Sequence, residues 1–426
     1  MIGRFSGRNL LRPSSHAWLI LALLWLVAFS YYLTRNMLTT MHGSIVAAIP
    51  MSDTQFGLLT SVFLWVYALM NPLGGALADR FSRSTVIIAS MLAWSAVTVL
   101  TGYATTFSHL LVLRAVMGIS QGCYMPAASA IITDYHRGST RSLAVGLHIT
   151  GLVLGSTASG LGGWLAERRD WMYAFRLVGL PSLALGVLLL FLLRDAPRED
   201  GNGGIESGET VRLGPAVASL LSTGSFLVMI LIYVLQSAVS WVVIGWMPTY
   251  MREQFHLSQG AAGFSATGYL SITQFVSLIA SGFWSDRWSR RNIRARLWVP
   301  AIGLAVAAPG FWLAEYSGLL FATILCLCVW GMAVGFMGSN MMPILCLVSD
   351  PRYRATAYGI ANGVGSVAGG LAVYGGGALR DLEIDLRRVL SFAGICSLLC
   401  AALFLLVRTP RGKSEDLAPD PNGSEA

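Results

Sequence analysis

The turn GALADRFSRS at residues 75–84 has a near copy in GFWSDRWSRR at residues 282–291. Both read Gly-x-x-x-Asp-Arg-aromatic-Ser-Arg, and each stands between two long apolar segments. A turn repeated about halfway along a chain indicates two structurally similar halves.

The composition is typical of a membrane protein. The chain has 426 residues, of which 55% are hydrophobic and only 12% are charged, and its mean hydropathy is +0.63. Soluble domains carry about 25% charged residues, and a span needs about 20 apolar residues. We predict an all-α integral membrane fold of two six-helix bundles, with twelve spans at 16–49, 54–78, 84–103, 108–134, 141–166, 171–194, 222–250, 258–284, 296–315, 318–348, 354–380 and 387–408.

The polar segments divide the chain. We expect a cytoplasmic N-terminal segment at 1–15, a first bundle at 16–194, a flexible linker at 195–221, a second bundle at 222–408 and a disordered tail at 409–426. The linker is rich in Gly and Glu, which favours flexibility. The first apolar segment is too long for the core of a signal peptide, so it is expected to remain as a span.

The formal net charge is +8, and the basic residues cluster at alternate turns between the apolar segments, such as Arg80 with Arg83 and Arg352 with Arg354. This is the positive-inside pattern, which places both termini in the cytoplasm. We expect the protein to lie in a cell membrane, most simply the inner membrane of a bacterium. The charge therefore predicts contact with a lipid bilayer and no nucleic-acid partner.

The sequence holds no motif for metal, cofactor or ATP chemistry. The six cysteines lie in apolar segments as packing residues, and there is neither a metal-ligand cluster nor a Walker-type Gly-Lys motif. We therefore expect a protein that is not an enzyme and uses no cofactor. We also expect it to be a monomer.

A second repeat supports the two halves. RAVMGISQGCYMP at 114–126 and GMAVGFMGSNMMP at 331–343 both space small residues four apart before a proline, and the helix starts RSLAVG and RATAYG follow them. Small residues at this spacing let helices approach closely.

Together, the Asp-Arg turn, its copy and the R-x-x-x-G-x-x-x-G-x-x-x-P pattern resemble the major facilitator superfamily over about residues 16–408. Within it, YYLTRN at 31–36 and GWMPTYMREQFHLS at 245–258 resemble the organophosphate:phosphate antiporters and the anion:cation symporters of sugar acids. The resemblance implies a secondary transporter that works by alternating access.

Arg35 lies within the first apolar segment, where an arginine costs about 2.5–3.5 kcal/mol on insertion scales. On a continuous helix its face would include Tyr31, Tyr32 and Thr39, with His42 two turns on. A guanidinium matches a carboxylate or phosphate with two parallel hydrogen bonds. By resemblance, Arg35 matches the arginine of span one that binds the anion, so we expect it to bind the substrate.

One departure from the phosphate-ester branch concerns charge. Its second arginine, in span seven, is replaced by Ser240, beside Trp241. One arginine balances a monocarboxylate better than a dianionic phosphate, so a carboxylate is expected, with organophosphate/phosphate exchange as the alternative.

Coupling needs a titrating group, and no Asp or Glu stands in the central part of a predicted span. His148 and, after it, His42 are the candidates for proton coupling, because histidine titrates near neutral pH. Exchange for a counter-anion and facilitated diffusion are the other modes.

Further polar residues lie on spans that line the cavity in the fold that the chain resembles. Each is also typical of a plain helix–helix hydrogen bond. These substrate-binding candidates are Tyr67, Gln121, Tyr124, Gln236, Ser240, Trp241, Tyr269, Gln274, Asn340 and Asn362.

The repeated turns are expected to gate the transporter. By resemblance they latch the halves at the cytoplasmic side, and Arg114 belongs to the same packing and gating set. The gating candidates are Asp79, Arg80, Arg83, Arg114, Asp286, Arg287 and Arg290.

Two other functions compete with anion transport. A transporter-like anion sensor would need a signalling partner, for which the chain offers only a short tail. A multidrug-type exporter of the same fold would carry embedded acids and a Gly-Pro motif in span five, whereas span five here has glycines and no proline.

Overall fold

The computed structural model describes residues 15–136, 140–195, 213–292 and 294–408, and these are helical, with no strand among them. The elements are α1 (Ser15–Asn36), η1 (Met37–Met41), α2 (His42–Ala48), α3 (Asp53–Arg80), α4 (Arg83–Thr101), α5 (Phe107–Gly122), α6 (Tyr124–Tyr135), α7 (Arg141–Ala158), α8 (Gly160–Arg168), α9 (Trp171–Leu192), α10 (Leu213–Leu221), α11 (Gly224–Phe255), α12 (Gln259–Ser289), α13 (Ala295–Ser317), α14 (Leu320–Val348), η3 (Pro351–Tyr353), α15 (Arg354–Asp381) and α16 (Leu386–Leu406).

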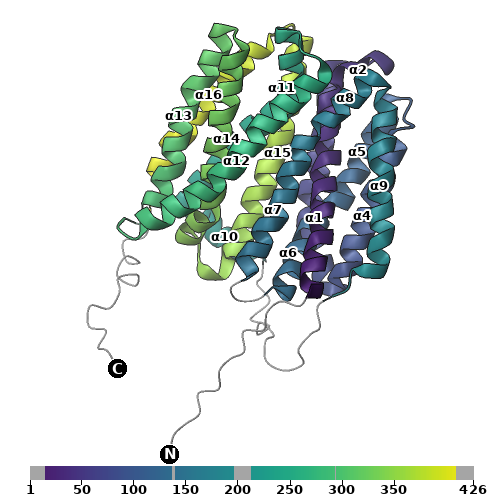
Figure 1. Cartoon of the computed structure of the whole chain (residues 1–426). Helices are drawn as coiled ribbons and strands as arrows, with labels where there is room; N and C mark the ends of the chain where they lie inside the picture. Colours follow the sequence, from purple (N-terminus) through teal and green to yellow (C-terminus); the bar gives the residue numbers. More distant parts are fainter. Residues whose placement is uncertain (1–14, 137–139, 196–212, 293, 409–426) are drawn as a thin grey trace, which may run out of the picture.

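Ten stretches of described helix are long and apolar enough to cross a membrane. Helices α12 and α15, with 31 and 28 residues, are as long as these ten stretches but richer in Gly and Ser. Together with the ten stretches they make up the twelve spans of the predicted fold. Figure 1 shows the helices of the first half, in purple and blue, side by side with the green and yellow helices of the second half.

The structure differs from the prediction inside three spans and in the linker. The first, fourth and fifth spans are each interrupted, at η1, at Cys123 and at Ser159. Residues 213–221 of the expected linker form α10, because its apolar residues pack, with Leu220 only 2% exposed. The expected segments 1–14 and 409–426, and 196–212 of the linker, lie outside the described residues.

The two ends of the molecule are distinguished by the helices that begin and end there. The near end is where α1 begins and α16 ends, and the far end is where α3 begins and α15 ends. One hydrophobic core lies within the first half, around Leu24, Phe63 and Trp94. The other core fills the second half and continues into far-end residues of the first half, including Met41 and Phe56.

The halves also meet closely at the far end. A Cβ on Gly160 would lie 2.5 Å from the backbone nitrogen of Phe264, and one on Gly377 would lie 2.3 Å from the carbonyl of Asp53. The Ser61 hydroxyl donates to the Gly370 carbonyl at 2.6 Å. These close approaches between halves need residues without side chains, as small-residue helix packing requires.

Candidate anion-binding site

Arg35 lies in the last turn of α1 and is only 5% exposed. Its guanidinium carbon lies near five aromatic rings, within the distance of cation–π contact. The distances to the ring centroids are 5.9 Å for Tyr31, 5.6 Å for Tyr32, 4.8 Å for Phe63, 4.7 Å for Tyr67 and 4.7 Å for Trp241. We call these five residues the aromatic cage.

The cage joins three helices and both halves. Tyr31 and Tyr32 come from α1, and Phe63 and Tyr67 come from α3, one helical turn apart. Trp241 comes from α11 in the second half. A movement of one half against the other therefore changes the surroundings of the Arg35 guanidinium.

No carboxylate pairs with Arg35 among the residues that the structure describes. Its NH1 donates a long hydrogen bond of 3.4 Å to the Tyr31 hydroxyl, and its Nε has no hydrogen-bond partner. A buried charge is normally paired and hydrogen-bonded. The cage thus holds a cation with unused donors.

Arg114 is a second buried cation, 3% exposed, whose guanidinium lies 4.9 Å from the Phe63 ring. Its Nε donates to the Leu59 carbonyl at 3.3 Å and its NH2 to the Arg35 carbonyl at 3.4 Å. The sequence assigned Arg114 to packing and gating, and the structure places it beside the cage with its donors directed at protein atoms.

Gln121 and Tyr124 lie behind Tyr31. The Gln121 Nε2 donates to the Tyr31 carbonyl and to the Thr34 hydroxyl, both at 3.3 Å, and its Oε1 has no partner. The ring of Tyr124 lies 5.2 Å from that of Tyr31. Both candidates contact the residue that contacts Arg35.

His148 connects to the cage through Tyr124. The Tyr124 hydroxyl donates to the Leu24 carbonyl at 3.2 Å and lies 2.9 Å from the His148 Nε2. His148 is 3% exposed. A continuous series of contacts therefore links Arg35, Tyr31, Tyr124 and His148.

The expected positions of Thr39 and His42 on the Arg35 face do not hold, because α1 ends at Asn36 and η1 follows. The Thr39 hydroxyl donates to the Asn36 carbonyl at 2.8 Å. The His42 Nε2 lies 2.7 Å from the Asp53 carboxylate at the far end. The tighter winding of a 3-10 helix turns both side chains away from the α-helical face.

The remaining candidates are more scattered. The Gln236 Nε2 donates to the Ser240 hydroxyl at 3.1 Å, one turn further along α11, and Ser240 directly precedes Trp241. The Asn340 amide donates to the Phe336 carbonyl at 2.9 Å in its own helix. Tyr269 and Gln274 lie on α12 and Asn362 lies on α15. The backbone carbonyls of Tyr269 and Gln274 accept hydrogen bonds from Thr273 and Ser277 of the same helix.

The gating candidates at the near end make contacts within their own halves. Arg83 pairs with Asp134 on α6, and the Asp286 carboxylate accepts from Arg296 on α13 at 2.8 Å. The other arginines of the two turns, Arg80, Arg287 and Arg290, are exposed. The side chain of Asp79 lies outside what the structure describes.

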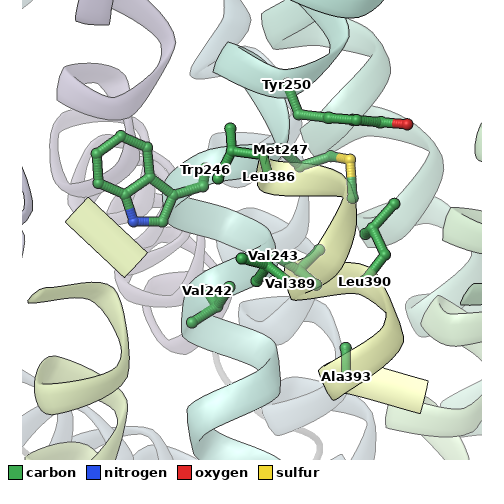
Figure 2. A pocket seen from close by; sticks show the side chains of 9 residues that line it. All are labelled: Val242, Val243, Trp246, Met247, Tyr250, Leu386, Val389, Leu390 and Ala393. Atoms are coloured by element: carbon green, nitrogen blue, oxygen red, sulfur yellow. The ribbon is translucent and has the colours of Figure 1, made fainter. Parts of the chain in front are cut away.

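A separate pocket between α11 and α16 is apolar. Figure 2 shows its lining, which carries no charged side chain and therefore offers no partner to an anion. The lining residues are Val242, Val243, Trp246, Met247, Tyr250, Leu386, Val389, Leu390 and Ala393.

Sequence reasoning missed Phe63 and the contacts that carboxylates make between the halves at the far end. Phe63 is apolar, so only its spacing of four residues from Tyr67 on one helix face could have indicated it. Asp53, Glu167 and Asp381 stand at helix ends, and nothing in the order of the residues shows that they reach across to the other half.

The comparisons with known proteins agree with this architecture. The D-galactonate transporter of Escherichia coli O6:H1 is 25% identical over 400 residues, covering 85% of this chain and 88% of that protein. The probable sulfoacetate transporter SauU of Cupriavidus necator is 30% identical over 304 residues, covering 67% and 70%.

A solved structure shows the same fold. A bacterial homolog of the human lysosomal transporter Spinster, in an inward-facing and unoccupied conformation, superposes with a TM-score of 0.80 at 21% identity, covering 92% of this chain and 97% of the other. The family model of the Major Facilitator Superfamily matches residues 24–373. The chain therefore belongs to the Major Facilitator Superfamily of membrane transporters.

Proposed function

We propose that the protein moves a small organic anion, preferably a carboxylate, across the membrane by alternating access, and that Arg35 binds the anion. The observation that carries the proposal is the Arg35 guanidinium, 5% exposed, ringed by aromatic side chains and unpaired with any described carboxylate. A substrate carboxylate would supply the missing counter-charge and accept two parallel hydrogen bonds.

The relatives support an anion. One is named a D-galactonate transporter and one a probable sulfoacetate transporter, and both compounds carry a carboxylate. The cage is made of rings and hydroxyls, which suit the apolar and hydroxylated parts of an organic acid. Because Trp241 comes from the second half, a bound anion would contact both halves, as alternating access requires.

Organophosphate/phosphate exchange is the second candidate, favoured by one observation. Arg114 brings a second positive charge to the same Phe63 ring that Arg35 contacts. The single-arginine reasoning from Ser240 therefore does not by itself exclude a dianion. The donors of Arg114 already have acceptors in the protein, however, whereas Arg35 has a free Nε, so a monocarboxylate fits better.

His148 is the group to which we assign proton coupling. It lies 2.9 Å from the Tyr124 hydroxyl, and Tyr124 contacts the cage residue Tyr31. Gaining a proton makes both ring nitrogens donors, which changes the hydrogen bond to Tyr124. In liposomes, His148→Gln should remove acceleration of uptake by an inward proton gradient, and unchanged acceleration would exclude this role.

The anion is tested by thermal shift. Purified protein is heated with monocarboxylates, sugar acids and phosphate esters, since a ligand of the folded state raises Tm. Wild type, Arg35→Ala, Arg35→Lys and the exposed control Arg352→Ala are compared. A carboxylate should stabilise wild type and Arg352→Ala strongly, Arg35→Lys weakly and Arg35→Ala not at all. Equal stabilisation of all four proteins would contradict anion binding by Arg35.

A further inference from the structure

Helices α3 and α12, which carry the repeated turns at their near ends, begin in the same way at the far end. Ser52 is the N-cap of α3, and its hydroxyl accepts from Gln55; Ser258 is the N-cap of α12, and its hydroxyl accepts from Ala261. In each helix this leaves the first two backbone N–H groups without an intrahelical partner.

A carboxylate from the opposite half binds those N–H groups in α3. Asp381, at the end of α15, accepts from the backbone nitrogens of Asp53 at 2.9 Å and Thr54 at 3.0 Å. A negative charge at this position is favoured by the dipole of the helix.

The same arrangement occurs at α12 with the halves exchanged. Glu167, near the end of α8, accepts from the backbone nitrogens of Gln259 and, at 3.3 Å, Gly260. Helix α8 ends the fifth span and α15 is the eleventh span. The Asp381 contact with α3 and the Glu167 contact with α12 are therefore related by the same repeat that relates α3 to α12.

Further side-chain contacts surround the carboxylates of Asp381 and Glu167, but these surrounding contacts differ in charge. Beside Asp381, Arg380 binds Asp53 at 2.9 Å across the halves and Glu253 in its own half at 2.8 Å. Beside Glu167, the Gln259 side chain exchanges neutral hydrogen bonds with Ser44, at 2.9 and 3.2 Å. The contact between α3 and α15 is therefore reinforced by ion pairs, whereas the described residues beside the contact between α8 and α12 form none.

We propose that Asp381 and Glu167 form a symmetric pair of locks that hold the far end closed and must both release when the transporter opens there. The lock rests on the alternating-access part of the proposed function, and it does not depend on the identity of the anion. Because each lock joins a side chain to backbone N–H groups, it can form again without a matching side chain on the partner helix.

The test measures the opening of the far end without ligand. Spin labels are placed at Tyr103 and Tyr316, which are 60% and 80% exposed in far-end turns of the two halves, in full-length protein whose six cysteines are replaced by serine. Electron–electron double resonance then gives the populations of short and long label distances. The variants are Asp381→Asn, Glu167→Gln and the double variant.

Matched controls use carboxylates that cap a helix of their own half at the same end. Asp170 accepts from the Tyr173 nitrogen at 2.5 Å, and Asp385 accepts from the Arg387 nitrogen at 2.9 Å. Asp170→Asn and Asp385→Asn remove the same charge without touching a contact between the halves. Asp381→Glu keeps the carboxylate and should stay closed, which separates loss of the lock from damage to the fold.

Each lock variant should raise the ratio of open to closed populations about two- to fivefold, and the double variant by about the product, while the controls match wild type. A wild-type distance distribution in the double variant, or an equal shift in the controls, would overturn the lock. If a ligand that raises Tm shifts the distances and the lock variants do not, only the lock fails. If neither shifts them, alternating access fails as well.

Discussion

Arg35 and Arg380 place the same guanidinium group in opposite surroundings. Arg380 is surrounded by acids: its Nε donates to Asp53 at 2.9 Å, and its two terminal nitrogens donate to Glu253 at 2.8 and 2.9 Å. Arg35 is surrounded by rings, is nearer to complete burial, and has no described carboxylate beside it.

The difference indicates what each charge does. The charge of Arg380 is neutralised within the protein, and one of its partners lies in the other half, so it stabilises a conformation. The charge of Arg35 is not neutralised by any described carboxylate, so it raises the free energy of the folded protein, and a bound anion would lower it. Under the proposed function, the same residue type would serve closure at the far end and ligand binding at the cage.

The largest expected effect is at Arg35. Arg35→Met should weaken binding of the stabilising anion about 100-fold, because hydrogen bonds to charged groups contribute about 1.5–3 kcal/mol and 1.4 kcal/mol corresponds to tenfold. Without ligand the variant should be as stable as wild type or more stable, since a buried unpaired charge is removed. Titration calorimetry and thermal unfolding measure the two effects. A ligand-free variant that is strongly destabilised would make Arg35 a structural residue.

Arg380→Met should have the opposite signature. It leaves Asp53 and Glu253 without their cation and should lower the free energy of unfolding by about 1–3 kcal/mol, toward the smaller value because Glu253 is partly exposed. Anion affinity should change little. Thermal unfolding with and without ligand checks both points, and a loss of affinity equal to that of Arg35→Met would erase the distinction between the two arginines.

Substitutions of Trp241 test how much an aromatic ring of the cage contributes to anion binding at Arg35. Trp241→Leu should weaken anion binding about three- to tenfold, because the cation–π contact that holds the guanidinium in place is worth about 0.5–2 kcal/mol. Trp241→Phe keeps a ring over Arg35 and is the matched control. Titration calorimetry should rank wild type, Phe and Leu in that order, and equal affinity of Leu and Phe variants would show that the ring face does not matter.

The smallest expected effect is a pH dependence at the far end. Asp381 lies just beyond the predicted span 354–380; burial opposes its ionisation, but hydrogen bonds from Thr54, Ser52 and the backbone of Asp53 outweigh this and lower its pKa to about 2. A depressed pKa gives stability that is complete above the ordinary value near 3.8 and is lost as the pH falls toward 2. Asp381→Asn should therefore have a lower Tm than wild type above pH 4, with the gap closing below it. A gap that stays constant down to pH 2 would contradict this.

The limits of sequence reasoning appear at particular residues. The bounds of the spans were predictable because long apolar runs separated by basic turns leave little choice within a bilayer. The sequence predicted correctly that Tyr31 and Tyr32 lie near Arg35, because all three residues share one helix. The same prediction was wrong for Thr39 and His42, because the chain switches to a 3-10 helix after Asn36 and no residue pattern marks the switch.

By itself the sequence determined the superfamily, the two-half repeat and the spans, and it singled out an arginine at membrane depth as a candidate. These depend on composition and on neighbours within one helix, which the order of residues states directly. Only the tertiary structure decided that Phe63 and Trp241 complete the cage, that Arg114 lies beside it, and that Asp381 and Glu167 cap helices of the opposite half. Such contacts join residues far apart in the chain, and the packing angle and rotation of each helix, which set them, are properties of the whole bundle.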